Sequence, residues 1–265
     1  MNDNKNFEAR IAELCERSAN RYCPCFTGFL TPEEQAAALY IARGFPDVFC
    51  LSFGGMEGAE RSLLGFFPSD VYLRPETGST DDERYQTYEK DAGLAFVRVT
   101  GSGYRRFSHR DVLGSLMSLG MKRETLGDIL VTEDEKSAYL VTLETVAPFI
   151  CTSLETVAND KVKAKEVLRG ELPAKKQRFA DMSLTLASVR LDALVAAALN
   201  LSRENAKRMV NSGRVFLNHA ECTAVDREFS EGDTVSVKGQ GKFLVESFLG
   251  KTAKDRYRVI VRKYL

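Results

Sequence analysis

The C-terminal third of the 265-residue chain contains the segments VRLDALV (189–195), LSRENAKRMVNSGRVFLN (201–218) and EGDTVSVKG (231–239). In the first segment the apolar residues recur at the spacing of one helical face. In the second, Ser202 is a good N-cap and Gly213 stands where a glycine ends a helix. The third alternates polar and apolar residues after Gly232-Asp233. This order predicts a short helix, a basic helix and a tight strand-turn-strand.

Basic side chains gather at the two helix starts and at one helix end of this predicted module. Arg203 and Lys207 are four residues apart and share a helical face, which Asn211 continues. Helix starts also leave backbone N–H groups free for a phosphate. Arg203 is expected to be exposed, so its removal should change stability little. We therefore predict contacts with a phosphate backbone, such as that of RNA, through Arg190, Ser202, Arg203, Lys207, Arg208, Asn211, Arg214 and Lys238.

The net charge of zero conceals opposite balances in two parts of the chain. Residues 1–160 contain 16 Lys and Arg against 25 Asp and Glu, whereas residues 161–265 contain 21 against 12. We expect the basic part to be attracted to a polyanion. We expect the acidic part to contact structured RNA or a protein partner.

No apolar run approaches the roughly 20 residues of a membrane helix. Six scattered cysteines in a chain of this size favour reduced thiols in the cytoplasm. Cys15, Cys23, Cys25 and Cys50 are irregularly spaced and have no nearby histidine, which favours free or buried thiols over a zinc site. We therefore predict a cytoplasmic protein with no membrane span, no cofactor and no metal ligand.

The residues before the C-terminal module alternate between helix and strand patterns, which predicts an α+β chain with an α/β N-terminal part. Helices are expected over about 5–20, 31–42, 109–119 and 146–157, the second and third starting at the caps Thr31 and Ser108. Strands are expected over 48–53, 61–67, 94–100, 128–132, 136–143, 183–186, 243–248 and 257–261. The polar segment 75–82 predicts a subdomain boundary.

The predicted division has four parts. They are an α/β subdomain over 1–78, a second and RRM-like α/β subdomain over 79–160, a basic and strand-containing connector over 161–180, and a helix-helix-β-hairpin RNA-binding domain over 181–265. A second RNA contact is predicted in the 79–160 subdomain, where an aromatic residue that can stack on a base stands beside basic residues. It comprises Tyr104, Arg105, Arg106, His109 and Arg110.

Four stretches resemble the YlmH family of bacterial proteins. They read FTGFLTPEEQ (26–35), SHRDVLGSL (108–116), LGMKRE (119–124) followed by GDI (127–129), and RLD (190–192). The C-terminal module also resembles the RNA-binding module of small-subunit ribosomal protein S-four. The resemblance covers nearly the whole chain. It implies a non-enzymatic RNA binder of the ribosome, on the large subunit or tRNA, linked to translation quality control and cell division. One departure is Asn218-His219 in place of Asn-Gly, which disfavours a type I′ turn.

Two other functions stay open. The triplet Arg190-Leu191-Asp192 also carries the catalytic aspartate of one class of pseudouridine synthases, although an acid in a first helical turn is explained by the helix dipole. Gly101-Ser102-Gly103 follows a strand as in an RNA methyltransferase, but lacks a clean glycine fingerprint. These two motifs leave an RNA-modifying enzyme as one alternative, and the other is a protein-interaction adaptor of the division machinery. The sequence favours RNA binding without a catalytic residue.

Overall fold

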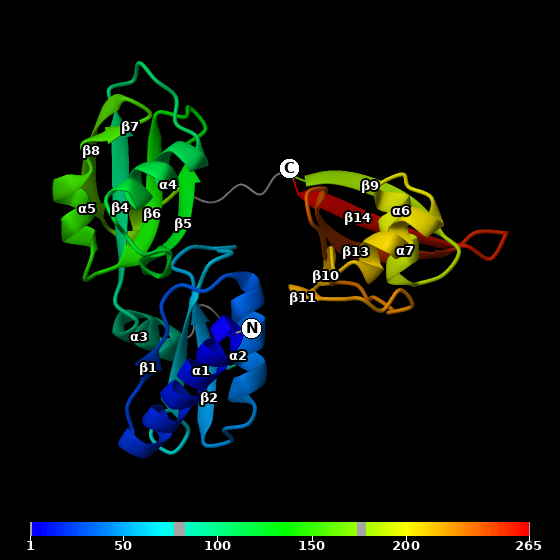
Figure 1. The fold of residues 1–265 in the computed structure, drawn as a ribbon, viewed down its shortest axis with the longest axis horizontal. Coiled ribbons are helices and arrows are strands. Elements are labelled where there is room, and N and C mark those ends of the chain that lie inside the picture. Colours follow the sequence, from blue (N-terminus) through cyan, green and yellow to red (C-terminus); the bar gives the residue numbers. More distant parts are fainter. Residues whose placement is uncertain (1, 77–82, 174–178, 265) are drawn as a thin grey trace. The chain divides into compact units, whose positions relative to one another are not determined.

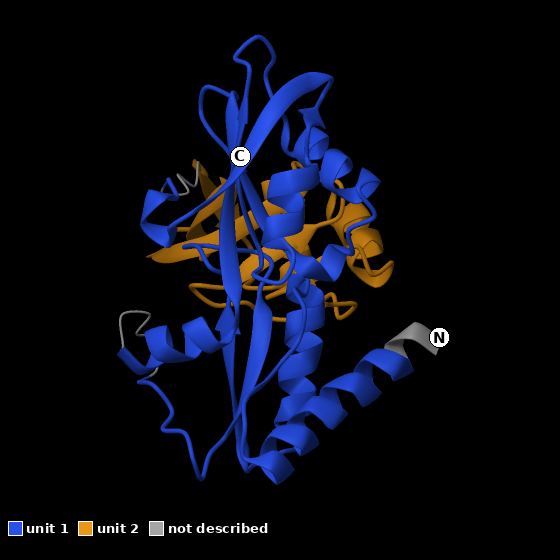
Figure 2. Cartoon of the chain, turned by 90° about the vertical axis from the view of Figure 1, so that its left-hand side faces the viewer, with its two compact units in different colours: residues 1–175 blue, residues 176–265 orange. Residues whose placement is uncertain are grey.

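The computed structural model describes residues 2–76, 83–173 and 179–264. The chain forms two compact units, unit 1 (residues 1–175) and unit 2 (residues 176–265), shown in Figure 1 and Figure 2. Each unit has hydrophobic core clusters of its own. Within the described ranges, no helix is both long enough and apolar enough to cross a membrane.

Unit 1 begins with a small sheet and two helices. The elements are α1 (Asn2–Arg21), β1 (Cys25–Phe26), α2 (Pro32–Ala42), β2 (Val48–Phe53) and β3 (Leu63–Pro68), and the antiparallel sheet has the order β1-β3-β2. The start of α2 is the predicted one. Thr31 accepts from the backbone N–H of Glu34, and the Glu34 carboxylate accepts from that of Thr31, which satisfies two N–H groups at the helix start.

The second half of unit 1 is an RRM-like split β-α-β arrangement, as the sequence predicts. Its elements are α3 (Glu83–Asp91), β4 (Leu94–Gly101), α4 (His109–Ser118), η1 (Arg123–Thr125), β5 (Leu126–Val131), β6 (Ser137–Leu143), α5 (Ala147–Ser153), β7 (Thr156–Val157) and β8 (Asp160–Val167). The antiparallel sheet has the order β5-β6-β4-β8-β7. Apolar residues of α4 and α5 pack on one face of this sheet. The predicted helix over 146–157 is shorter than expected because its last residues form β7.

The basic segment over 161–180, predicted as a strand-containing connector, does begin with a strand, and that strand belongs to the larger sheet of unit 1. Residues 160–167 form β8, which pairs with β4 along most of its length, and a short η2 (Arg169–Glu171) follows. Val162 and Ala164 pack toward the core, while Lys161, Lys163 and Lys165 are exposed. The strand has the period of two expected for a half-buried strand. Because lysine supplies its polar face, the segment resembles a charged linker in sequence.

The two predicted subdomains of unit 1 share one aromatic core. Phe53 and Phe67 of the small sheet pack with Tyr88 of α3 and with Val141 of the larger sheet. Gly55, at φ +76°, lies so close to the larger sheet that a Cβ would stand 2.7 Å from a methyl of Val141. The predicted boundary at 75–82 falls mostly on 77–82, outside the described residues. The halves over 1–78 and 79–160 therefore fold as one body.

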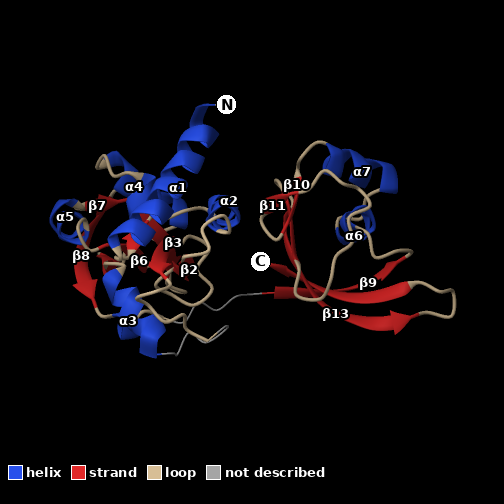
Figure 3. Cartoon of the chain, turned by 90° about the horizontal axis from the view of Figure 1, so that it is seen from below, coloured by secondary structure: helices blue, strands red, loops and turns tan. Residues whose placement is uncertain are grey.

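Unit 2 is larger than the predicted helix-helix-hairpin. It contains β9 (Phe179–Leu186), α6 (Leu191–Ala198), α7 (Arg203–Asn211), β10 (Val215–Leu217), β11 (Ala220–Glu221), β12 (Thr234–Val237), β13 (Gly241–Lys251) and β14 (Tyr257–Tyr264). The sheet has the order β11-β10-β12-β13-β14-β9, and both helices lie on one side of it (Figure 3). The predicted hairpin over 243–261 is present as β13 and β14.

The turn between β10 and β11 has the backbone of a type I′ turn, although His219 disfavours that turn type. Asn218 and His219 have φ values of 48° and 68°, both positive, as a type I′ turn requires. The Asn218 side chain donates to Asp233 at 2.7 Å and accepts from the backbone N–H of Thr234 at 2.8 Å. These two bonds fix the turn and offset the strain at His219.

Unit 2 is expected to fold alone, from residue 176 rather than 181. The rings of Phe179 and Tyr264 stack edge to face with centroids 4.9 Å apart, and β9 pairs with β14 from Phe179 onward. A fragment of residues 176–265 should melt cooperatively. A fragment of residues 181–265 loses the ring pair, a cost of about 1 kcal/mol, and should melt roughly 5 °C lower. Calorimetry of both fragments checks this. A broad, non-cooperative melt of 176–265 would contradict it.

Candidate RNA interface

The basic helix of unit 2 begins as the sequence predicts. The Ser202 hydroxyl accepts from the backbone N–H of Asn205 at 3.2 Å, so Ser202 caps α7. At the other end the N–H of Gly213 bonds to the carbonyl of Val210 at φ +68°, and a Cβ there would stand 2.3 Å from a carboxylate oxygen of Glu221. The positive φ favours a glycine at this helix end, while the exposed Glu221 side chain could move aside for a Cβ.

Arg190 and Arg203 converge on a carboxylate buried in the module. Asp192, in the first turn of α6, has a side chain with 0% exposure. Its Oδ2 lies 2.9 Å from Nη2 of Arg203 at the start of α7, and its Oδ1 lies 3.5 Å from Nε of Arg190. The two arginine side chains, of Arg190 and Arg203, remain 38% and 44% exposed. The carboxylate therefore holds two partly exposed guanidinium groups near one another.

This pairing corrects the expectation that Arg203 is a freely exposed side chain with little influence on stability. Asp192 is in the first helical turn, as predicted, but it is surrounded by protein rather than by solvent. A buried carboxylate needs a cationic partner, since an uncompensated charge in the interior is costly. Eleven positions separate Asp192 from Arg203. The helical period does not show which residues of two neighbouring helices face one another, so sequence reasoning missed the pair.

Arg214 and Lys238 are brought together on neighbouring strands. Arg214 Nη2 donates to the carbonyl of Lys238 at 3.0 Å, and the N–H of Lys238 donates to the carbonyl of Arg214 at 2.9 Å. Both residues are exposed. Their cationic groups lie where β10 begins and β12 ends, directly after the C-terminus of α7.

The other predicted contacts lie along α7. Lys207 is half-buried and Asn211 exposed, and both continue the helical face of Arg203. Arg208 stands about 100° further round the helix axis than Lys207. It forms an exposed pair with Glu204 at 3.9 Å. Arg208 therefore flanks the face rather than belonging to it.

The second predicted contact lies in the loop between β4 and α4 of unit 1 and in the first turn of α4. Tyr104 is 94% exposed, and Arg105, Arg106, His109 and Arg110 are also exposed. Arg106 pairs with Glu135 at 3.4 Å. The Ser108 and Asp111 side chains form a capping box at the start of α4. The loop thus presents an aromatic ring beside cations, and its contact with RNA remains a prediction.

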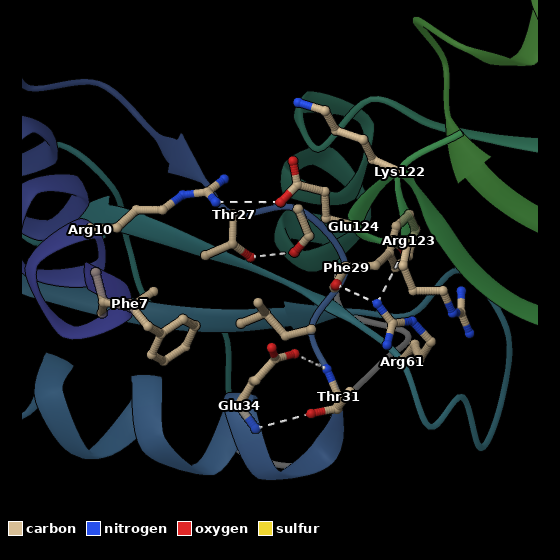
Figure 4. A pocket seen from close by; sticks show the side chains of 13 residues that line it. Phe7, Arg10, Thr27, Phe29, Thr31, Glu34, Arg61, Lys122, Arg123 and Glu124 are labelled. Carbon is tan, nitrogen blue, oxygen red and sulfur yellow. Dashed lines mark hydrogen bonds and ion pairs between the residues drawn. The ribbon is translucent and has the colours of Figure 1, made fainter. Parts of the chain in front are cut away.

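A pocket of about 610 Å³ lies where the two halves of unit 1 meet (Figure 4). The stretches 26–35 and 119–124, which resemble the YlmH family, both contribute to its lining. Several of its polar side chains already have partners in the protein. Arg10 forms an ion pair with Glu124 at 3.4 Å across the pocket, and Glu34 caps α2. Several of these resembling residues therefore have a structural role in joining the two halves.

Arg61 is the centre of this joint and was not predicted. Only 9% of the residue is exposed. Its Nη2 donates to the carbonyls of Phe29 at 2.6 Å and Arg123 at 3.2 Å, and its Nε donates to that of Leu126 at 3.1 Å. Burial lowers the pKa of Arg61, while the Glu34 and Asp128 carboxylates oppose that shift. A lone arginine before an apolar strand gives no sequence signal of such burial.

The cysteines offer no assembled metal site in the part of the chain that the structure describes, where no three His, Cys, Asp or Glu residues are grouped to hold an ion. Burial raises the pKa of Cys15 to about 11 and that of Cys50 to about 12, so these thiols stay protonated near neutral pH. Cys25 accepts from Nε of Arg17 at 3.2 Å. Protonated thiols are poor metal ligands.

Comparison with known proteins relates these features to a family. Residues 89–170 match the model described as "Putative RNA-binding domain in YlmH", and residues 189–235 match the "S4 domain" model. The solved structure "Cell division protein ylmH from Streptococcus pneumoniae" has a TM-score of 0.50 at 19% identity, covering 64% of this chain and 93% of that one, and so supports the fold. The chain is also 31% identical to "Ribosome-associated protein quality control protein P2" of Bacillus subtilis (strain 168) over 259 residues, which span 97% of this chain and 94% of that relative. Because this similarity extends over nearly the full length of both proteins, the chain belongs to the YlmH family.

Proposed function

We propose that this protein binds RNA on the ribosome without catalysing a reaction, and that it acts in translation quality control in the cytoplasm. The name of the Bacillus subtilis relative supports association with the ribosome and a role in quality control. Matches to two RNA-binding models support RNA as the ligand. The RNA would be ribosomal RNA, tRNA or both. A link to cell division is supported by the name of the pneumococcal protein.

The observation that carries this proposal is the convergence of Arg190 and Arg203 on buried Asp192. The Arg203 guanidinium is hydrogen-bonded to Asp192, and Arg190 lies within ion-pair distance of the same carboxylate, while part of each arginine side chain stays exposed. Guanidinium groups and helix-start N–H groups both bind phosphate oxygens. Lys207, Arg214 and Lys238 extend the basic surface along α7 and past its end. Such contacts would position an RNA backbone and would not read its sequence.

Two structural observations weigh against the enzymatic alternatives. The Asp192 carboxylate has no exposed surface, so a nucleotide cannot reach it as it would a catalytic aspartate. The strand pairs described in unit 1 are antiparallel, whereas a nucleotide-binding methyltransferase fold is built on a mostly parallel sheet. The adaptor alternative concerns the acidic N-terminal part, for which we propose contact with structured RNA or with a protein partner.

Replacing Arg214 by alanine is expected to weaken RNA binding by about 1 kcal/mol and to reduce the salt slope by about 1, because Arg214 would neutralise one phosphate. The effect should be similar for RNAs of different sequence. RNA affinity measured at several salt concentrations checks this, together with co-sedimentation with ribosomes.

The matched control for Arg214→Ala is Lys254→Ala, in the turn between β13 and β14, where the side chain is also exposed. Arg227 is unsuitable as a control because it lies next to the predicted site: its carbonyl accepts a hydrogen bond from the N–H of Leu191, the residue after Arg190. Equally weakened binding by the two variants would show that only diffuse charge matters, and would contradict a site at Arg214.

A further inference from the structure

We propose that the β4–β8 half of the larger sheet in unit 1 is a second RNA surface, which holds the phosphate backbone through Arg98, Lys161, Lys163 and Lys165. The inference rests on the proposed function. The surface is distinct from the predicted RNA contact at Tyr104–Arg110.

The two faces of this sheet are covered differently. The face toward α4 and α5 is buried along its whole width. The opposite face is covered at one end only, where Phe96 and Val141 pack into the aromatic core shared with the first half of the unit. Beyond Phe96 on the same face, Arg98 and Thr100 of β4 are exposed. The sheet therefore leaves part of one face open to solvent.

The open part is basic because of strand register. Arg98 lies directly opposite Lys165 and Thr100 directly opposite Lys163, so these side chains project from the same face. Lys161 follows two positions further along β8. All four cationic residues are exposed. The described contacts of the three lysines include no ion pair, and Arg98 lies over the Tyr139 ring at 5.6 Å.

The arrangement suits a nucleic acid backbone. Alternate residues of a strand are about 6.7 Å apart, close to the separation of successive phosphates along an extended RNA strand. A groove of about 1140 Å³ runs beside β8 and is lined by all four cations. Glu155 and Glu171 line it as well, and Glu171 is bound to the N–H of Leu168. Unit 1 as a whole, residues 1–175, is acidic, with 21 Lys and Arg against 27 Asp and Glu, which distinguishes the patch from a generally basic surface.

The same geometry argues against base stacking as the main contact. RNA recognition motifs stack bases on aromatic residues of the open sheet face. Here Phe96 packs into the core, and Tyr139 is only 9% exposed beneath Arg98. The surface would therefore bind phosphates and be indifferent to sequence. At its far end it is continuous in sequence with the loop of Tyr104, since Gly101 and Ser102 also line the groove.

The test uses the full-length chain and a labelled single strand of mixed-sequence RNA, with oligouridine of the same length as a second probe. The variant Lys161→Gln, Lys163→Gln, Lys165→Gln should bind both probes about 10-fold more weakly, and its salt slope should fall by about 0.7 for each phosphate that is no longer neutralised. Replacing the same lysines by arginine should retain binding. A matched control removes three exposed cations elsewhere in unit 1, by Lys5→Gln, Arg43→Gln, Lys90→Gln, and should bind like the natural chain.

Four results would overturn the inference. Unchanged RNA binding by the β8 variant, with weaker binding by Arg214→Ala, would leave the proposed function intact and remove this surface. An equal effect of the scattered control would assign the change to net charge. If the β8 variant bound RNA like the natural chain but no longer sedimented with ribosomes, the partner of β8 would be an acidic protein. Absence of RNA binding by the natural chain would reject the proposed function and this surface together.

Discussion

Replacing Arg61 by methionine is expected to lower the free energy of unfolding of unit 1 by about 2 kcal/mol. Methionine fills much of the same space but donates no hydrogen bond. The carbonyl of Phe29 would then lack its bond from Arg61, while that of Arg123 keeps its bond from the N–H of Leu126 and that of Leu126 keeps its 2.8 Å bond from Nη1 of Arg123. A buried carbonyl left without a partner costs about 2 kcal/mol. Equilibrium urea unfolding of the full chain measures the change.

Arg21→Met is the matched control, since Arg21 is an exposed arginine at the end of α1. It should change the free energy of unfolding by no more than about 0.5 kcal/mol. If Arg61→Met had an equally small effect, the joint between the two halves of unit 1 would not depend on this guanidinium. The shared aromatic core would then hold the halves together alone.

Replacing Arg203 by alanine is expected to destabilise unit 2 by about 2 kcal/mol, because it leaves the buried Asp192 carboxylate with Arg190 alone. The value is below that for a fully buried pair because Arg203 is partly exposed. Asp192→Asn should be destabilising too, and the double variant less so than the sum of the two. The expected coupling energy is about 1 to 2 kcal/mol. Urea unfolding of the four proteins of this cycle checks it.

Arg208→Ala provides the comparison on the same helix, where a 3.9 Å surface pair with Glu204 is removed. Such exposed pairs contribute little, about 0.5 kcal/mol or less. If Arg203→Ala cost no more than Arg208→Ala, Asp192 would be stabilised by other means. RNA affinities of the Arg203 variant have to be measured where the protein is fully folded, so that weaker binding is separated from lower stability.

Local signals in the sequence predicted most of the regular structure. Helix caps at Thr31, Ser108 and Ser202 are side-chain effects within one turn, and each begins a helix where predicted. Alternating strand and helix patterns predicted an α/β N-terminal part, whereas its strand order is given by the structure. By contrast, α3 (Glu83–Asp91) is polar and was missed, since its burial against the aromatic core depends mainly on two tyrosines, Tyr85 and Tyr88.

Properties that depend on distant partners could not be predicted. The sequence indicated Arg190 and Arg203 as cations, but their shared carboxylate depends on how α6 packs against α7. Arg61 is surrounded by carbonyls from segments more than thirty positions away. The alternating lysines of β8 share one face of their strand, but their position beside Arg98 depends on pairing with β4. In each case the missing information is a tertiary contact, which hydrophobic period and capping do not encode.

The aromatic core of unit 1 also determines how this protein can be observed optically. The chain has nine tyrosines and no tryptophan. Tyr88 lies 4.8 Å from the Phe67 ring and 5.6 Å from that of Tyr72, and Tyr85 lies 5.2 Å from Phe53, all ring centroid to centroid. Close aromatic rings couple electronically, so the near-ultraviolet dichroism of the native chain should arise mainly from unit 1. Disappearance of most of that band would signal unfolding of unit 1, with a smaller contribution from the Phe179–Tyr264 ring pair of unit 2, without any attached dye.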